Sequence, residues 1–118
     1  MKTVLVVDDE PILRDLIVEA LRGAGYAVDV AHDGATALKK VESDPPDLVL
    51  MDVMMPGMDG RAAYKAMRSR GDLPQLPVVL MSAAVQPTTL DGTIAGFLRK
   101  PFDFDALLAL VASVVGPH

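Results

Sequence analysis

Residues 47–60, DLVLMDVMMPGMDG, join an unbroken apolar run to a carboxylate and then to a methionine-rich loop. The run Leu48–Met51 is typical of a strand that is covered on both faces of a parallel sheet. Four methionines recur there at helical spacing: Met51, Met54, Met55 and Met58. Pro56 and Gly57 disfavour a helix through them. The stretch therefore predicts an interior strand that delivers Asp52 to its carboxyl end.

Strand and helix patterns alternate outward from this stretch. Apolar runs predict strands at 3–7, 26–31, 47–51, 77–81 and 96–99. Helices are expected from Pro11, from Asp33–Gly34, over 60–70 and from Asp103. The order predicts one α/β domain over residues 1–118, with a doubly wound, five-stranded parallel sheet and right-handed crossovers.

The first helix shows the clearest amphipathic pattern. Its apolar residues recur at a period of 3.6 and are Ile12, Leu13, Leu16, Ile17, Ala20, Leu21 and Ala24. We expect this stripe, like those of the other helices, to be a core face and nothing more.

Composition excludes several classes of protein. With 51% apolar and 23% charged residues, the chain is neither disordered nor membrane-like, and its apolar runs fall well short of the ~20 residues that span a bilayer. MKTVLVV reaches Asp8 too soon for a secretory signal, which predicts a cytoplasmic protein. The absence of cysteine excludes disulfides and thiol chemistry. A net charge of −5, with no basic cluster denser than RSR at 68–70, favours a protein or small-ion partner over nucleic acid.

Polar residues stand where four of the predicted strands end. They are Asp8, Asp9 and Glu10 after the first strand, Asp52 after the third, Ser82 after the fourth and Lys100 after the fifth. Ligands bind outside the carboxyl ends of such strands. Converging carboxylates require a compensating cation, and Mg²⁺ typically uses one or two carboxylates with a phosphate. With Lys100 as a fixed positive charge and Ser82 as a hydroxyl donor, the set predicts a phosphoryl site with an aspartate nucleophile.

Acids that follow a strand also cap the next helix, and for Asp9 or Glu10 alone we favour that interpretation. It accounts poorly for Asp52, because Val53, Met54 and Met55 follow it rather than a helix start.

Four segments together resemble the receiver domain of two-component response regulators. They are VLVVDDEP (4–11), DLVLMDVMMPGMDG (47–60), VVLMSA (78–83) and GFLRKPF (96–102), in the order that the family has them. The resemblance covers essentially the whole chain. It implies the flavodoxin-like, CheY-like version of the fold. It also implies a signalling domain rather than an enzyme, one that catalyses only its own phosphorylation and dephosphorylation.

Carried over by position, the resemblance implies a role for each site residue. Asp52 is similar to the phosphoacceptor, which attacks the phosphohistidine of a sensor histidine kinase or phosphotransfer protein and so switches a surface that binds a downstream partner. The implied ligands of Mg²⁺, with Mn²⁺ as a substitute, are Asp9, Asp52 and the backbone carbonyl of Met54 directly, and Asp8 through a water. The implied phosphoryl contacts and switch residues are Lys100, Ser82 and Phe97. The Lys100–Pro101 bond is expected to be cis.

Plainer interpretations compete at single residues. Ser82 alone is an ordinary strand-end hydroxyl, Lys100 alone is a solvated lysine, and Phe97 suits a core aromatic as well as a switch. A Cu(I) site at the methionines lacks supporting Cys or His ligands. His32 is expected at the surface and His118 at a free terminus, neither with a role.

Other functions of a strand-end aspartate fit less well. Aspartyl-phosphate hydrolases resemble Asp-x-Asp, whereas Met54 holds the second position here and 118 residues leave no room for a cap domain. A nucleotide-binding domain would need the glycine-rich fingerprints that this chain lacks. A receiver-like scaffold that never takes phosphate is disfavoured by the complete residue set.

The chain departs from the family between Ser82 and Phe97. The segment AAVQPTTLDGTIAG contains Pro87, a Thr-Thr pair and Gly92, and it lacks an amphipathic stripe. It is shorter than the family's usual connection by about one helical turn. We therefore expect a shortened or irregular fourth helix over 83–95, and this segment to be the most mobile part of the unphosphorylated domain.

Overall fold

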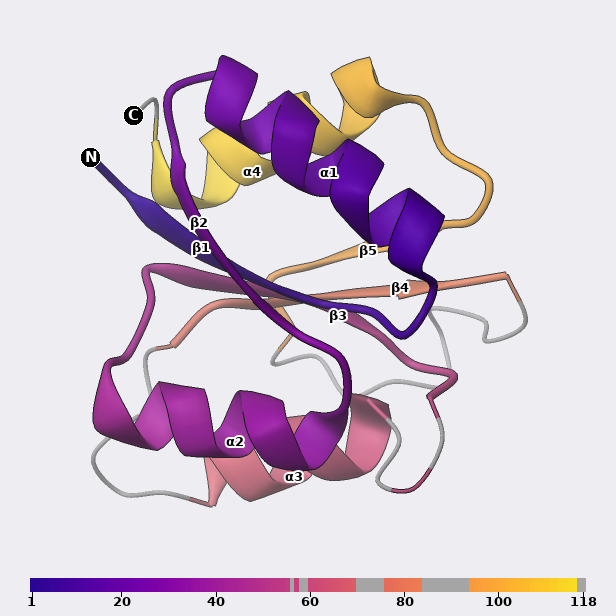
Figure 1. Cartoon of the computed structure of the whole chain (residues 1–118). Helices are drawn as coiled ribbons and strands as arrows, with labels where there is room; N and C mark the ends of the chain where they lie inside the picture. The colour runs from indigo at the N-terminus through magenta and orange to yellow at the C-terminus, as the bar shows by residue number, and fades with distance from the viewer. Residues whose placement is uncertain (56, 58–59, 70–75, 84–93, 117–118) are drawn as a thin grey trace.

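Five parallel strands form one sheet that lies between two layers of helices (Figure 1). The computed structural model of the chain describes residues 1–55, 57, 60–69, 76–83 and 94–116. Its strands are β1 (Thr3–Val7), β2 (Ala27–Ala31), β3 (Leu48–Asp52), β4 (Val78–Ser82) and β5 (Gly96–Arg99). Its helices are α1 (Pro11–Gly23), α2 (Gly34–Ser43), α3 (Gly60–Arg68) and α4 (Phe104–Val115). The predicted strands and helices are confirmed within two residues at each described boundary.

The strand order is β2-β1-β3-β4-β5, and all four pairings are parallel. The chain runs outward from β1 to β2 and then returns across β1 to begin β3. The strand order therefore reverses between β1 and β3, and in doubly wound sheets the crevice at such a point is where ligands bind. The doubly wound parallel sheet predicted from the sequence is confirmed.

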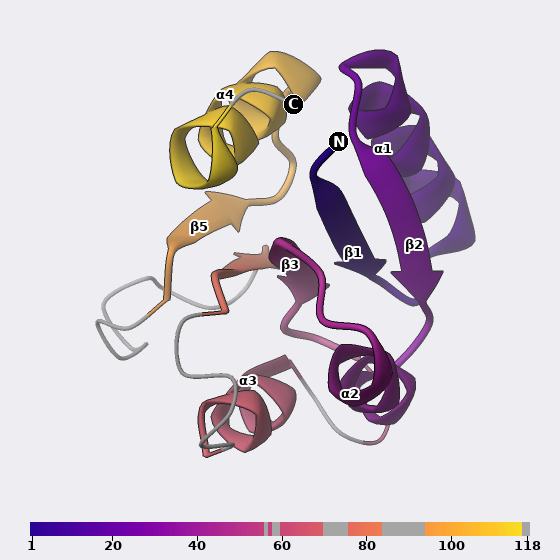
Figure 2. The same cartoon turned by 90° about the vertical axis from the view of Figure 1, so that its left-hand side faces the viewer.

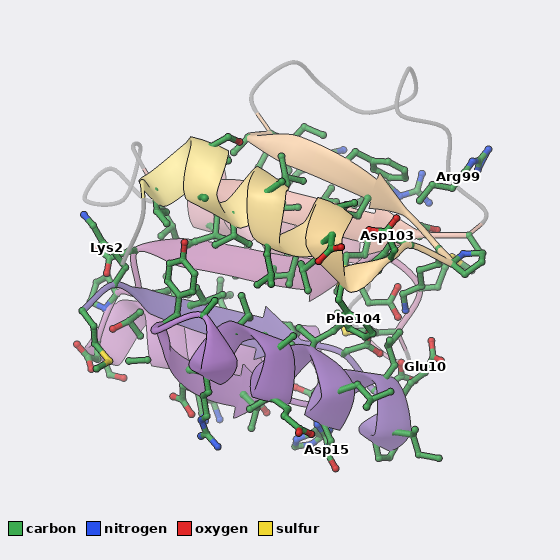
Figure 3. The ribbon with its side chains drawn as sticks, turned by 90° about the horizontal axis from the view of Figure 1, so that it is seen from above. Lys2, Glu10, Asp15, Arg99, Asp103 and Phe104 are labelled. Atoms are coloured by element: carbon green, nitrogen blue, oxygen red, sulfur yellow. The ribbon has the colours of Figure 1, made fainter. Side chains whose placement is uncertain are left out.

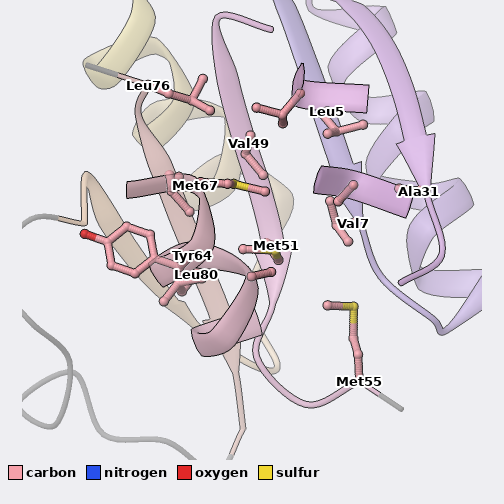
Figure 4. Packing of buried hydrophobic residues seen from close by; sticks show 14 of the residues in the cluster. Leu5, Val7, Ala31, Val49, Met51, Met55, Tyr64, Met67, Leu76 and Leu80 are labelled. Carbon is pink, nitrogen blue, oxygen red and sulfur yellow. The ribbon is translucent and has the colours of Figure 1, made fainter. Parts of the chain in front are cut away.

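Two apolar cores lie on opposite faces of the sheet. Figure 2 shows α1 and α4 covering one face and α2 and α3 covering the other. Successive residues of a strand point to opposite faces, so Val4 and Val6 pack with α1 and α4, whereas Leu5 and Val7 pack with α2 and α3. Every residue of β3 is buried, as expected of an interior strand. Figure 4 shows the core beside α3, where Val49 of β3 and Met67 of α3 both lie.

The described methionines near Asp52, which are Met51, Met54 and Met55, do not lie in a helix. Met51 belongs to β3 and is fully buried, and Met55 packs in the core beside α2 and α3. The side chain of Met54 is 58% exposed. Met58 lies outside the described residues.

Two of the predicted helix starts are confirmed, and each has a side-chain cap. Oδ1 of Asp33 accepts the N–H of Thr36 at 2.7 Å, and Oδ1 of Asp103 accepts the N–H of Ala106 at 2.7 Å. Each bond satisfies a backbone donor that the first turn of a helix leaves without a partner. His32, at the end of β2, is exposed as predicted.

The interpretation of the α1 stripe as a core face is wrong for two residues. Ile17 and Leu21 are fully buried, but Ile12 is 80% exposed and Leu16 is 47% exposed. Ile12 and Leu16 are four residues apart and so share the edge of the stripe that is turned away from Ile17 and Leu21, and the sheet covers only part of the stripe.

The expected fourth helix over 83–95 falls almost entirely outside the described residues, so its length and its mobility stay predictions. The Lys100–Pro101 peptide bond is cis, as expected. Among the described residues, none of the helices has the length and hydropathy needed to cross a bilayer.

Candidate functional site

Strand register places Asp8 and Asp52 side by side. Val7 of β1 pairs with Met51 of β3, so the next residue along each strand is an aspartate. Asp8 is fully buried and Asp52 is 3% exposed. Two carboxylates thus lie together at the carboxyl end of the sheet, at the point where the strand order reverses.

A close approach of α3 supports the backbone at Asp52. The N–H of Gly60, the first residue of α3, donates to the carbonyl of Val53 at 2.9 Å. A Cβ at Gly60 would press on the carbonyl oxygen of Asp52 and lie 2.8 Å from Cα of Val53. Only glycine lets α3 begin this close to the strand end. The N–H of Met54 donates to Oδ1 of Asp52 at 3.2 Å and orients that carboxylate.

Lys100 reaches both buried aspartates from the residue that follows β5. Its backbone N–H donates to the carbonyl of Ser82 at 3.1 Å, which fixes the start of its side chain beside β4. Its Nζ lies 3.1 Å from Oδ2 of Asp8 and 3.4 Å from Oδ2 of Asp52. The same Nζ donates to Oε1 of Glu10 at 2.9 Å. One ammonium is therefore shared among three carboxylates.

Burial and the neighbouring charges act in different directions on the pKa of Asp52. Burial raises the pKa of Asp52 above its ordinary value, and the charge of Asp8 adds to the effect, although Lys100 acts against both. Burial would lower the pKa of Lys100, but its hydrogen bonds to Glu10 and Asp8 and the charges of Asp8 and Asp52 outweigh burial and raise that pKa. Lys100 therefore stays charged, while burial disfavours the ionised form of Asp52.

The donor atoms suit a hard divalent cation. Asp8, Glu10 and Asp52 each offer a carboxylate oxygen, and these three atoms lie within 4.8 Å of one another. Carboxylate oxygens are the ligands that Mg²⁺ prefers, and a second positive charge would relieve the repulsion that Lys100 leaves. Among the described residues, Asp9 is not part of this group and is half-buried beside it.

Of the other predicted site residues, Ser82 lies at the same end of the sheet, whereas Phe97 lies within β5 and pairs with Leu80 of β4. Ser82 ends β4 and is 1% exposed. Phe97 of β5 is partly buried against the core beside α2 and α3. The structure thus joins Asp8, Asp52 and Lys100 by direct ion pairs, and it brings Ser82 next to them through the backbone of Lys100.

Glu10 is the site residue that sequence reasoning missed. It is the N-cap residue of α1, yet its side chain forms no capping hydrogen bond, so the helix-cap interpretation of that side chain is wrong. Three successive acids after a buried strand were the available signal, because a single cap needs only one of them.

An apolar groove adjoins the site. Figure 3 shows Glu10, at the start of α1, and Phe104, at the start of α4, at the same end of the molecule. The groove between these helix starts has a volume of about 410 Å³ and is lined by Glu10, Leu13, Leu16, Ala83, Lys100, Pro101, Phe102 and Phe104. Half-exposed Leu16 borders it, so a bulky partner can reach apolar surface directly beside Lys100.

Comparison with known proteins gives one family. The response regulator receiver domain family matches residues 4–112. The response regulator MprA of Mycobacterium ulcerans (strain Agy99) is 37% identical over 116 residues, which cover 95% of this chain and 49% of that protein. The chain spans about half the length of the curated relatives it matches.

Solved structures of receiver domains superpose over nearly the whole chain. The chemotaxis protein CheY4 of Vibrio cholerae is 32% identical with a TM-score of 0.88, over 97% of this chain and 98% of that one. The receiver domain of the sensor histidine kinase PA1611 of Pseudomonas aeruginosa PAO1 is 27% identical with a TM-score of 0.88, over 98% of both chains. In that structure a magnesium ion is coordinated in the active site cleft.

Proposed function

This chain belongs to the response regulator receiver domain family, and from that premise we propose that Asp52 is its phosphoacceptor. Phosphotransfer is the general mechanism of the family, and receiver domains bind Mg²⁺ at an acidic pocket. The observation that carries the proposal is the position of Asp52, an aspartate at the carboxyl end of an interior strand with the Lys100 ammonium 3.4 Å from its Oδ2.

The reaction is a displacement at phosphorus. A carboxylate oxygen of Asp52 forms a bond to the phosphorus of a phosphohistidine while the nitrogen–phosphorus bond breaks, and the imidazole leaves with the electron pair of that bond. Lys100 binds oxygens of the transferred group as a fixed positive charge. The Ser82 hydroxyl donates a hydrogen bond to the same group once it is in place.

The acidic group supports a divalent cation at this site. We propose that the pocket holds Mg²⁺, or Mn²⁺ in its place, through Asp52, Asp9 and the carbonyl of Met54, with Asp8 acting through water. Mg²⁺, when bound, supplies positive charge to the phosphoryl oxygens. The Asp8, Glu10 and Asp52 oxygens within 4.8 Å of one another support this assignment by the chemistry of their donor atoms.

Receiver domains of response regulators interact with histidine kinases, and we propose such a kinase or a phosphotransfer protein as the donor. The groove beside Lys100 gives a protein donor apolar surface within reach of Asp52. Phosphorylation then shifts the domain from one conformational state to another, and Ser82 and Phe97 are the switch residues. A downstream protein binds the phosphorylated state. Raising the population of the active state from ~1% to ~99% requires that phosphorylation stabilise it by about 5.5 kcal/mol relative to the inactive state.

Labelling by acetyl phosphate tests this function. We expect wild-type protein with Mg²⁺ to gain the mass of one phosphoryl group, and Asp52→Asn to gain none while keeping its circular dichroism spectrum. Asp15→Asn is the matched control, because that carboxylate is exposed on α1 and lies outside the acidic group. Stoichiometric labelling of Asp52→Asn would remove Asp52 from the role. A wild-type chain that is never labelled would identify the scaffold alternative instead.

A further inference from the structure

The carboxylate of Glu10 does not serve the helix that it starts. Asp33 and Asp103 cap α2 and α4 with their side chains, whereas Glu10 contributes only its backbone at the start of α1. Its N–H donates to Oδ1 of Asp8 at 2.9 Å, and its carbonyl accepts the N–H of Arg14 at 2.9 Å. The side chain is therefore left to make a contact 90 residues away along the chain, with Lys100.

Three carboxylate oxygens surround the Lys100 ammonium, which has three N–H donors. The distances from Nζ are 2.9 Å to Glu10, 3.1 Å to Asp8 and 3.4 Å to Asp52. The contacts with Glu10 and Asp8 are hydrogen bonds, and the contact with Asp52 is an ion pair. A group on Asp52 that draws the ammonium toward its own oxygens therefore competes with Glu10 and Asp8.

Burial decides which carboxylate is released. The Asp8 side chain is fully buried, and separating it from Lys100 would leave a buried charge with no cationic partner, which is strongly unfavourable. The Asp52 side chain is 4% exposed and carries the new group itself. The Glu10 side chain is 59% exposed, so water replaces Lys100 at small cost.

We propose that Glu10 is a positioning residue that holds the Lys100 ammonium in the unmodified site and yields it to the phosphoryl group on Asp52. The inference rests on the proposed function, because it needs Asp52 to take that group. Glu10 then competes with the phosphoryl oxygens for Lys100 and sets part of the affinity of the site for them.

Beryllofluoride, a tetrahedral mimic of the phosphoryl group on an aspartate, measures this competition without turnover. We expect Glu10→Gln, at Mg²⁺ concentrations that saturate each variant, to bind beryllofluoride about two- to five-fold more tightly than wild type in an NMR titration. The matched control is Glu19→Gln, which removes the same charge from the exposed face of α1 and should bind as wild type does.

The Nζ resonance of Lys100 gives a direct second readout. Glu10→Gln should shift it in the unmodified protein and leave it at the wild-type position in the beryllofluoride complex. Unchanged beryllofluoride affinity, or an equal gain in Glu19→Gln, would overturn the proposal. So would a tenfold loss of Mg²⁺ affinity with weaker beryllofluoride binding, since Glu10 would then be a metal ligand. Failure of the proposed function would give a different result, because the wild-type protein itself would then bind no beryllofluoride.

Discussion

Asp52 lies where an ionised carboxylate is costly. Burial and the neighbouring charge of Asp8 raise the pKa of Asp52 above its ordinary value near 3.8, despite the attraction of Lys100. The folded chain therefore holds the Asp52 proton more tightly than the unfolded chain does. Below the ordinary value both states are protonated and Asp52 contributes nothing. As pH rises through the raised pKa, the folded state loses stability, and the loss persists at neutral pH.

Replacing this carboxylate should therefore stabilise the metal-free protein. We expect Asp52→Asn to raise the free energy of unfolding at pH 7 with EDTA present, because an amide carries no charge that burial penalises. The gain should vanish below pH 3.8, where the wild-type carboxyl is neutral in both states. Urea unfolding across this range checks both the sign and the window.

Asp29 supplies a control, because its pKa is shifted in the opposite direction to that of Asp52. Its hydrogen bond from Lys40 lowers the pKa of Asp29, so Asp29 contributes stability above its ordinary value that is lost as pH falls. Because its side chain is 58% exposed, we expect Asp29→Asn to cost at most about 0.5 kcal/mol at pH 7. A loss of stability in Asp52→Asn at pH 7 would show that its pairing with Lys100 outweighs its burial.

The same helix carries apolar residues with very different surroundings. Ile12 and Ile17 both belong to α1, but Ile12 is 80% exposed and Ile17 is fully buried against the sheet. We expect Ile17→Ala to lower the free energy of unfolding by about 2–5 kcal/mol, since it removes buried surface and leaves a cavity. Ile12→Ala should change it by less than about 0.5 kcal/mol. Chemical denaturation of the two variants makes the comparison, and equal losses would contradict the assigned orientation of α1.

The limits of sequence reasoning are clearest in elements such as α1. The 3.6-residue period identifies which side chains share a stripe, but not how far the sheet extends beneath it, so the exposure of Ile12 and Leu16 was not predictable. Capping is equally ambiguous, because Glu10 and Asp33 both precede a helix and only Asp33 caps with its side chain. The partner of Glu10 comes from the other end of the chain, which no local pattern reports.

At the scale of the whole molecule, the site was more predictable than these details. A parallel sheet brings all strand ends of one polarity to one edge, so residues that follow different strands converge whatever their separation along the chain. This is why Asp8, Asp52 and Lys100 were found from position alone, and why register then places Asp8 beside Asp52. The contact of Glu10 with Lys100 could not be predicted, because side-chain direction decides which of the acids after β1 reaches the ammonium.

Three carboxylates surround one ammonium at the site, so a cation that binds there should also stabilise the whole fold. A ligand that binds only the folded state stabilises it by RT ln(1 + [L]/Kd), which is about 1.4 kcal/mol for each tenfold rise in concentration above Kd. Since Asp8 and Asp52 come together only in the folded chain, we expect Mg²⁺ to raise the free energy of unfolding along this slope. Asp52→Asn, which lacks one of these two charges, should gain much less. Urea unfolding at several Mg²⁺ concentrations measures the slope.

The control is KCl at matched ionic strength, because salt also screens the repulsion between the carboxylates. Screening by salt acts over a distance of about 10 Å at 0.1 M. Equal gains in KCl, or in Asp52→Asn, would mean that the fold responds to ionic strength and not to a cation held by these carboxylates.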